Sequence, residues 1–160
     1  MTDQTLGLAL EQEHRSIDQG IAATLSSIAD GHPDFGPLRG ALSLLRRHIY
    51  LEEARLFPPL RGGRLAAAIF VMLREHGEMW GDMTALDARI EAGDAAAVAS
   101  QARSLLAALD QHNGKEEPVI YSGMDPDLPP GLATELVAWL AEGRMPAGWA
   151  CARATTAPAT

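Results

Sequence analysis

The chain lacks the features that mark membrane and secreted proteins. It has 160 residues and a single cysteine, Cys151, so no internal disulfide can form and nothing requires an oxidising compartment. No hydrophobic run approaches the roughly 20 residues that span a bilayer. The N-terminal stretch MTDQTLGLALEQEH has neither the basic region nor the long apolar core of a signal peptide. These absences predict a cytoplasmic protein that does not act at a membrane.

Aromatic residues and clustered positive charge are also scarce. Aromatic residues make up 5% of the chain, and runs of Val, Ile, Thr and Tyr are almost absent, which favours an all-α fold. The composition is 47% hydrophobic and 21% charged, as in an ordinary globular domain. The formal net charge is −8 and no Lys- or Arg-rich stripe occurs. Because phosphate binding needs clustered cations, we expect no nucleic-acid partner.

The spacing of hydrophobic residues and the positions of Gly and Pro predict five helices. They run over about residues 4–29, 37–58, 65–92, 94–121 and 132–142. Short links between the four long segments predict an up-down-up-down antiparallel four-helix bundle, with the short fifth helix on its outside or capping one end. We therefore expect one domain over residues 1–143. Residues 144–160 show no periodicity and are expected to form a flexible tail.

One motif, His-x-x-x-Glu-Glu, occurs twice. It lies in RRHIYLEEARLFPPL (residues 46–60) and again in QHNGKEEPVIYSGMD (residues 111–125). Positions i and i+4 share one face of an α-helix, so His48 projects with Glu52, and His112 with Glu116. Each pair offers one imidazole and one carboxylate to the same point, which is a natural half of a metal site.

The other two long helices carry one histidine each near their middle, His14 and His76, and a glutamate precedes both. The chain thus reads as two helical hairpins of one design, which suggests an internal duplication. In an antiparallel bundle all four histidines and both glutamates can meet in one layer. This set is too large for one structural zinc, which takes four ligands. It suits two first-row metals with bridging carboxylates; iron is favoured, and manganese and zinc are compatible.

These motifs resemble the hemerythrin-like (HHE cation-binding) domains over about residues 8–124, and EEARLFP after His48 is typical of the bacterial members. The resemblance implies a non-haem di-iron centre. The implied ligands are His14, His48, Glu52, His76, His112 and Glu116.

The ligand set departs from that of the oxygen-carrying hemerythrins. Those proteins have two histidines four residues apart on the third helix, whereas Met72 stands four residues before His76 here, where we expect it to line the site. The fourth-helix carboxylate is a glutamate at i+4. The set is closer to the bacterial repair-of-iron-centres proteins and other non-carrier members, so reversible O₂ storage is disfavoured.

The resemblance implies binding of a small diatomic ligand, O₂ or NO, in a nitrosative or oxidative stress response or in iron handling. Two alternatives stay open: a metal- or redox-state sensor or interaction module, and a di-iron oxidase or peroxidase. The sequence is compatible with an enzyme and with a binding protein, with a monomer and with a homodimer, and with iron, manganese or zinc as the native metal.

Several nearby polar residues have less certain roles. Asp18, four residues after the first of these histidines, is a seventh ligand, an acceptor for an imidazole N–H or a surface carboxylate. Glu53 and Glu117 follow the ligand glutamates and are turned by about 100°. We expect them in solvent or paired with basic side chains such as Arg47 or Lys115.

The sequence gives no reason to place four further residues among the metal ligands. His32 lies in the loop DGHPDF and is excluded from the site. Gly114 and Pro118 leave two alternatives for the fourth helix. They distort it locally and so change the direction of Glu116, or the helix ends early, near Pro118. Cys151 has no neighbouring histidine or CxxC partner, so a redox role is unsupported.

Overall fold

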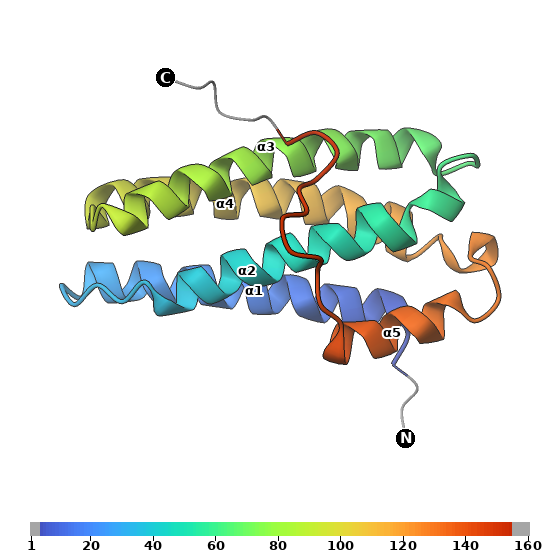
Figure 1. The fold of residues 1–160 in the computed structure, drawn as a ribbon, viewed down its shortest axis with the longest axis horizontal. Coiled ribbons are helices and arrows are strands. Elements are labelled where there is room, and N and C mark those ends of the chain that lie inside the picture. Colours follow the sequence, from blue (N-terminus) through green and yellow to red (C-terminus); the bar gives the residue numbers. More distant parts are fainter. Residues whose placement is uncertain (1–3, 155–160) are drawn as a thin grey trace.

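A computed structural model describes residues 4–154. Its four long helices are α1 (Leu6–Ala29), α2 (Gly36–Leu51), α3 (Ala66–Glu91) and α4 (Ala95–Glu116), and α5 (Leu132–Glu142) follows. The long helices run side by side with alternating direction (Figure 1), and α1 contacts α2 and α4 while α3 also contacts both. The described residues contain no strand. The predicted all-α four-helix bundle with a short fifth helix is confirmed.

Local sequence signals explain where the helices begin and end. The Thr5 side chain accepts a hydrogen bond from the Leu8 N–H and caps the start of α1. Asp94 caps α4 in the same way by accepting from the Ala97 N–H at 3.0 Å, as its position predicts. Gly93, with φ at 67°, provides the left-handed turn between α3 and α4.

Short π-helical segments follow α2 and α4 at matching places in the two hairpins. They are η1 (Glu52–Leu56) and η3 (Glu117–Tyr121); two 3₁₀ turns, η2 (Pro58–Leu60) and η4 (Asp125–Asp127), come later in each link. The π pattern is closed by i→i+5 bonds, from the Phe57 N–H to Glu52 O and from the Ser122 N–H to Glu117 O. The fourth helix therefore continues past Pro118, with the distortion that the sequence left open.

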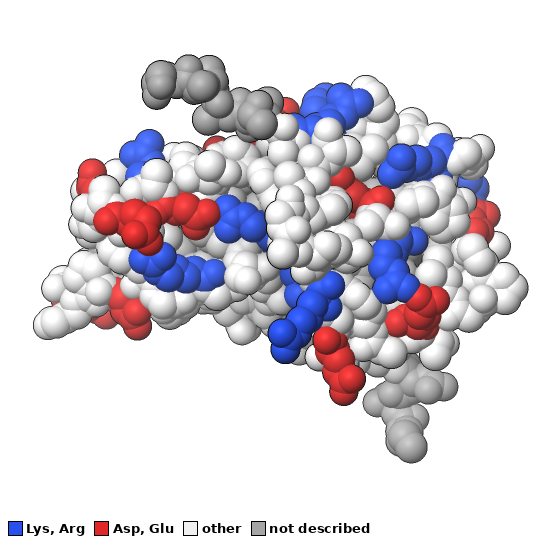
Figure 2. Space-filling view, viewed as in Figure 1, with Lys and Arg blue, Asp and Glu red and all other residues white. Residues whose placement is uncertain are grey.

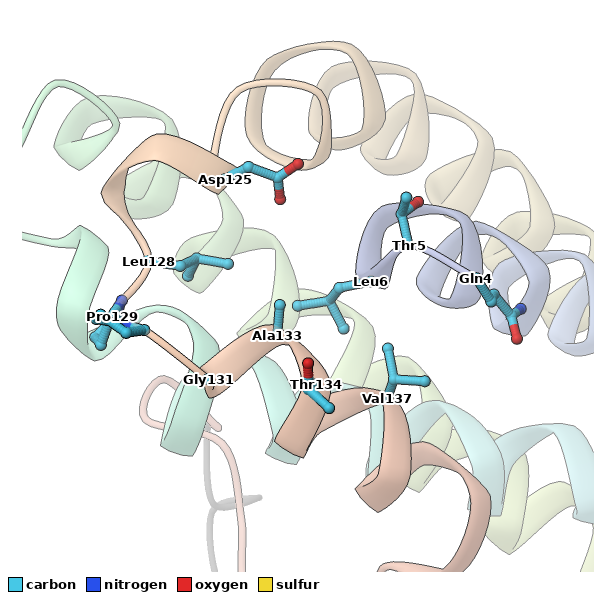
Figure 3. A pocket seen from close by; sticks show the side chains of 11 residues that line it. Gln4, Thr5, Leu6, Asp125, Leu128, Pro129, Gly131, Ala133, Thr134 and Val137 are labelled. Carbon is cyan, nitrogen blue, oxygen red and sulfur yellow. The ribbon is translucent and has the colours of Figure 1, made fainter. Parts of the chain in front are cut away.

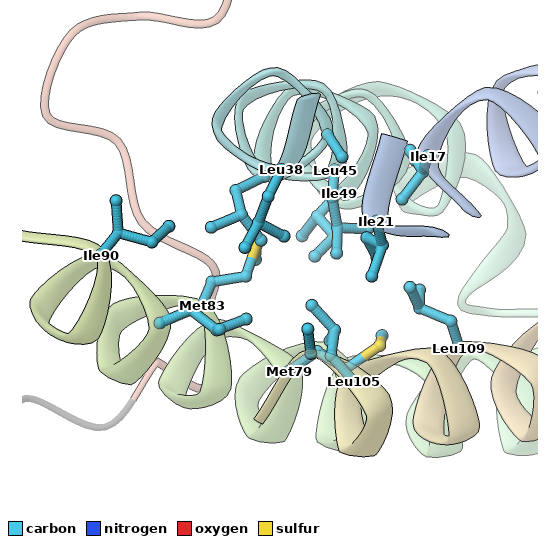
Figure 4. Packing of buried hydrophobic residues seen from close by; sticks show 14 of the residues in the cluster. Ile17, Ile21, Leu38, Leu45, Ile49, Met79, Met83, Ile90, Leu105 and Leu109 are labelled. Atoms are coloured by element: carbon cyan, nitrogen blue, oxygen red, sulfur yellow. The ribbon is translucent and has the colours of Figure 1, made fainter. Parts of the chain in front are cut away.

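The hydrophobic core forms two clusters at opposite ends of the bundle. The first, drawn in Figure 4, joins all four long helices and includes Ile21, Leu45, Met83 and Leu105. The second joins the earlier halves of α1 and α3 to the segments that follow α2 and α4 and to α5, and includes Leu10, Leu56, Ile69 and Ile120. The buried histidines His14, His76 and His112 lie between residues of the two clusters along the chain, and His48 lies near the end of α2, where the first cluster gives way to the second. A polar layer is therefore enclosed by apolar side chains on both sides.

The fifth helix packs on the outside of the bundle, against α1 (Figure 1). The Arg47 guanidinium donates to the carbonyl oxygens of Trp139, Leu140 and Gly143, at 2.9, 2.6 and 2.9 Å. These carbonyls lie at the C-terminal end of α5, where helix carbonyls run out of intrahelical donors, so Arg47 acts as its cap together with the Gly143 N–H, which donates to Trp139 O.

The segment after α5 crosses the bundle toward α3 (Figure 1). Cys151 is buried in the first core cluster, and the Ala152 N–H donates to the Glu53 carboxylate at 2.8 Å. A Cβ placed on Gly77 in α3 would collide with the backbone of Arg153, so this glycine allows the segment to lie directly on the helix. Residues 144–154 of the expected flexible tail thus make specific contacts, and residues 155–160 lie outside the described part.

Charges of both signs are interspersed on the face shown in Figure 2. Two ion pairs join α2 to α3, between Arg46 and Asp87 at 2.7 Å and between Arg39 and Glu91 at 3.0 Å. Exposed pairs of this kind contribute little to stability, roughly 0–1 kcal/mol each. Among the described residues, no helix combines the length and the apolar character needed to cross a membrane.

Candidate metal centre

The structure brings all six predicted site residues into one buried layer. Each long helix contributes one histidine; Glu52 opens the π segment after α2, and Glu116 ends α4. Nitrogen and oxygen atoms of these residues form two groups, within each of which all atoms lie within 4.8 Å of one another. The first group is His14, His48, Glu52 and Glu116, and the second is Glu52, His76, His112 and Glu116.

The two glutamates belong to both groups and lie between them. Glu52 Oε1 is 3.2 Å from His48 Nε2, and Glu52 Oε2 is 3.2 Å from His76 Nε2. Glu116 Oε2 is 3.6 Å from His14 Nε2 and 3.4 Å from His112 Nε2. Each carboxylate therefore faces one histidine of each group, which is the position of a bridging ligand between two cations.

Unpaired buried atoms show that these donors fit a metal. Glu52 Oε2, Glu116 Oε1 and His76 Nε2 are buried without a hydrogen-bond partner. A buried polar atom without a partner costs roughly 1–3 kcal/mol, so native proteins rarely leave several together. Imidazole nitrogens and carboxylate oxygens are ligands that iron, manganese and zinc accept. The cluster is therefore compatible with binding of two such ions.

Every imidazole in the layer has a carboxylate on its Nδ1 side. These carboxylates belong to four glutamates, which we call the outer glutamates. Each is next to a predicted ligand in the sequence and pairs with the histidine of a neighbouring helix. The pairs are His14–Glu117 at 2.8 Å, His48–Glu13 at 3.7 Å, His76–Glu53 at 2.9 Å and His112–Glu75 at 2.9 Å. An Nδ1–H that donates outward leaves the Nε2 lone pair directed inward, so three close pairs fix the tautomer and the ring orientation.

The outer positions of Glu53 and Glu117 correct an expectation from the sequence. We expected both in solvent or paired with basic side chains such as Arg47 or Lys115. For Glu53 this was wrong, because it is 6% exposed and accepts a hydrogen bond from His76. Glu117 keeps 35% of its side chain exposed and also accepts a hydrogen bond, from His14. A turn of about 100° from a core position points to the next helix of a bundle rather than to water. Arg47 and Lys115 pair instead with the other two outer glutamates.

Electrostatics within the layer favour an ionised Glu52 carboxylate. Burial raises the pKa of Glu52, but His48 and His76 outweigh it and hold that pKa well below its usual range. Burial lowers the pKa of His76, yet the close contact with the Glu52 carboxylate and the hydrogen bond to Glu53 raise it to about 9. For His14, burial and the nearby His48 dominate and lower the pKa. Cations would replace protons as the partners of these carboxylates.

The sequence did not predict one residue of this layer, Tyr121. Its side chain is 4% exposed, and its hydroxyl donates to Glu52 Oε1 at 2.5 Å. Burial, followed by the carboxylates of Glu116 and Glu52, raises the pKa of Tyr121 well above its usual range. The signal that could have found it is its position: Tyr121 ends the stretch after the second His-x-x-x-Glu-Glu, where Phe57 ends the first.

Two other candidates lie outside the layer. Asp18 is in neither group; its Oδ1 is buried without a hydrogen bond, and burial, Asp110 and Glu117 raise its pKa. Of the three roles left open for Asp18, that of a ligand thus lacks support from the geometry. His32 is exposed in the α1–α2 link, and its Nδ1 lies 3.0 Å from Asp30 O.

A cavity of about 620 Å³ lies away from the layer, where the start of α1 meets η4 and α5 (Figure 3). Leu6, Leu128 and Val137 supply its apolar lining, and Thr5 and Asp125 line it with polar atoms. None of the six layer residues lines this cavity, so its size says nothing about the chemistry of the histidines and glutamates.

Comparison with known proteins agrees with this geometry. The family model for the hemerythrin HHE cation-binding domain matches residues 8–122, which include α2, α3, α4, all but the first two residues of α1, and the whole polar layer. No curated protein and no solved structure matches the chain. The match covers most of the chain, and the protein therefore belongs to the hemerythrin HHE cation-binding domain family.

Proposed function

We propose that the protein holds a non-haem di-iron centre that binds O₂ or NO and serves in a nitrosative or oxidative stress response or in iron handling. The proposed ligands are His14, His48, Glu52, His76, His112 and Glu116. The observation that carries the proposal is the sharing of Glu52 and Glu116 between two four-residue groups. A single ion would need one such group; two groups with common carboxylates match a pair of ions.

Three features of the chain support a reactive centre over a purely structural one: the outer glutamates, the two apolar clusters and Met72. An iron pair, when bound, supplies one-electron chemistry and positions that a diatomic ligand can take. The outer glutamates orient the imidazoles and hold a proton on Nδ1. The two apolar clusters exclude water from both sides of the layer. Met72, buried where the carriers have a histidine, leaves the second group with one imidazole fewer.

Metal analysis tests the centre itself. After anaerobic and aerobic iron loading, we expect about two irons per chain and the optical spectrum of a bridged ferric pair. His48→Ala and Glu116→Ala should lose iron because each removes a ligand of one or both groups. His32→Ala, which changes an exposed loop histidine, is the matched control and should keep both irons. Less than one tightly bound metal, unaffected by these substitutions, would overturn the proposal.

Titration of the iron-loaded protein with NO tests the ligand. We expect the optical spectrum to change saturably with NO and the change to be absent from His48→Ala. An iron-loaded protein whose spectrum does not respond to NO or to O₂ would leave the metal centre in place but refute diatomic binding.

A second candidate function, a metal-state sensor, is favoured by one contact. Glu53 accepts hydrogen bonds from His76 Nδ1 and from the Ala152 N–H, so one carboxylate joins the second group to the C-terminal segment. A change at His76 would reach that segment through this carboxylate. If the segment reports on the metal, proteolysis after Arg144 should speed up when iron is removed; an unchanged rate would refute this function.

A further inference from the structure

The two hairpins differ at one buried aromatic position beside the metal layer. Phe57 lies five residues after Glu52, and Tyr121 lies five residues after Glu116. Each is reached through a π-helical segment, whose wider turn stacks residue i+5 over residue i. Phe57 stacks on His76 of the second group at 5.9 Å between ring centroids, whereas Tyr121 stacks on His14 of the first group at 5.5 Å. Among the described residues, a tyrosine hydroxyl therefore lies beside the two histidines of the first group, and Phe57 offers none to those of the second.

The Tyr121 hydroxyl oxygen touches every member of the first group. It lies 2.5 Å from Glu52 Oε1 and 3.1 Å from Glu116 Oε2. It lies 3.2 Å from the Nε2 atoms of both His14 and His48. Adjacent ligands of an octahedral ion with bonds of about 2.1 Å lie about 3 Å apart, so these spacings are those of a fifth ligand next to the other four.

Three of the distances among the four other atoms fall in the same range. His14 Nε2 is 3.0 Å from His48 Nε2 and 3.6 Å from Glu116 Oε2, and His48 Nε2 is 3.2 Å from Glu52 Oε1. These distances are compatible with five donor atoms arranged around one ion. A tyrosine that served only to fill space would need no hydroxyl there, because Phe57 fills the corresponding place in the other hairpin.

We propose that Tyr121 is a protein ligand of the metal bound by the first group, coordinating as a phenolate, and that the second group lacks an equivalent. This inference rests on the proposed di-iron function. On binding, the phenol O–H bond breaks, a metal–oxygen bond forms and the proton leaves to solvent, with no change in oxidation state. The two metal positions are then unequal: the first is richer in hard oxygen ligands, and the second, beside Phe57 and Met72, is the more open to a small molecule.

The test combines iron analysis with resonance Raman spectroscopy of the oxidised, iron-loaded protein. We expect a phenolate-to-iron charge-transfer band, with tyrosine ring modes enhanced by excitation into it. Tyr121→Phe should lose the band and the ring modes while keeping about two irons per chain. Tyr50→Phe, which changes the other tyrosine, packed between Trp139 and Trp149, should keep both signals. Growth of Tyr50→Phe on ring-deuterated tyrosine should then shift every enhanced mode, because only Tyr121 remains.

The reciprocal variant uses the relation between the hairpins. Phe57→Tyr places a hydroxyl beside the second group, and we expect a second set of ring modes. The double variant Phe57→Tyr with Tyr121→Phe should restore the modes that Tyr121→Phe removes. A native protein with two ferric irons but no tyrosine ring modes, or modes that survive in Tyr121→Phe, would overturn the inference and leave the di-iron centre standing. Failure of the native protein to bind iron would overturn both.

Discussion

Single residues next to the ligands decide how the imidazoles are held. Glu13, Glu53, Glu75 and Glu117 each sit one position from a proposed ligand and serve the histidine of a neighbouring helix. The His48–Glu13 pair, at 3.7 Å, is the loosest. The ligand motif alone did not predict this arrangement, because a helix face derived from one segment says nothing about which helix lies beside it.

Glu53→Gln should weaken metal binding without removing a ligand. The amide keeps the size of the side chain but accepts the His76 Nδ1–H more weakly, so His76 loses its orientation. We expect iron affinity to fall by roughly 10- to 100-fold in competition with a chelator.

Glu78→Gln is the control for this substitution, since Glu78 lies on the same region of α3 with 68% of its side chain exposed. Equal affinities of the two variants would mean that the hydrogen bond between Glu53 and His76 does not tune the metal site.

At the scale of the element, the C-terminal segment carries a testable thiol. Burial, followed by the nearby Glu53 carboxylate, raises the pKa of Cys151 to about 11. The thiolate is the reactive form, so at neutral pH about 100-fold less of it is present than for an ordinary thiol. Alkylation by iodoacetamide should therefore be slow at pH 7 and should accelerate up to pH 11.

Gly77→Ala tests whether the slow alkylation of Cys151 is caused by packing of the C-terminal segment on α3. A Cβ there collides with the backbone of Arg153 and should displace the segment, so Cys151 should react at a rate close to that of a free thiol at pH 8. Gly40→Ala adds a methyl to an exposed position of α2 with open space around it and should leave the rate unchanged. If both variants react as slowly as the native protein, the segment does not protect the thiol.

At the scale of the whole molecule, the polar layer divides the core and ties stability to metal. Six buried polar residues lie between two apolar clusters, and several of their atoms are unpaired without a cation. Metal at 100 to 1,000 times its dissociation constant should add about 3–4 kcal/mol to the free energy of unfolding. Chelation should lower Tm by on the order of 10 °C in calorimetry. His48→Ala should show a much smaller difference with and without chelator.

The sequence predicted the parts of the structure that depend on local periodicity and spacing. The five helices and the convergence of the histidines with Glu52 and Glu116 follow from hydrophobic period and i,i+4 spacing. The π segments, the outer carboxylates, the Tyr121 hydroxyl and the docked segment around Cys151 did not follow. Each of these depends on which helix surfaces pack against each other. The hydrophobic period of a single segment does not specify its contacts with distant segments.

If the two hairpins arose by duplication, as their matching motifs suggest, the shared carboxylates limit how the copies could evolve. Duplicate copies usually diverge because one can decay while the other keeps the ancestral role. Neither hairpin holds a complete group here, so the loss of Glu52 or Glu116 in either copy harms both metal positions at once. Selection would therefore act on the two copies jointly at the ligands, while Phe57 and Tyr121, each stacked on one group, were free to differ. A symmetric ancestor could acquire two unequal metal positions through a change at Phe57 or Tyr121 alone.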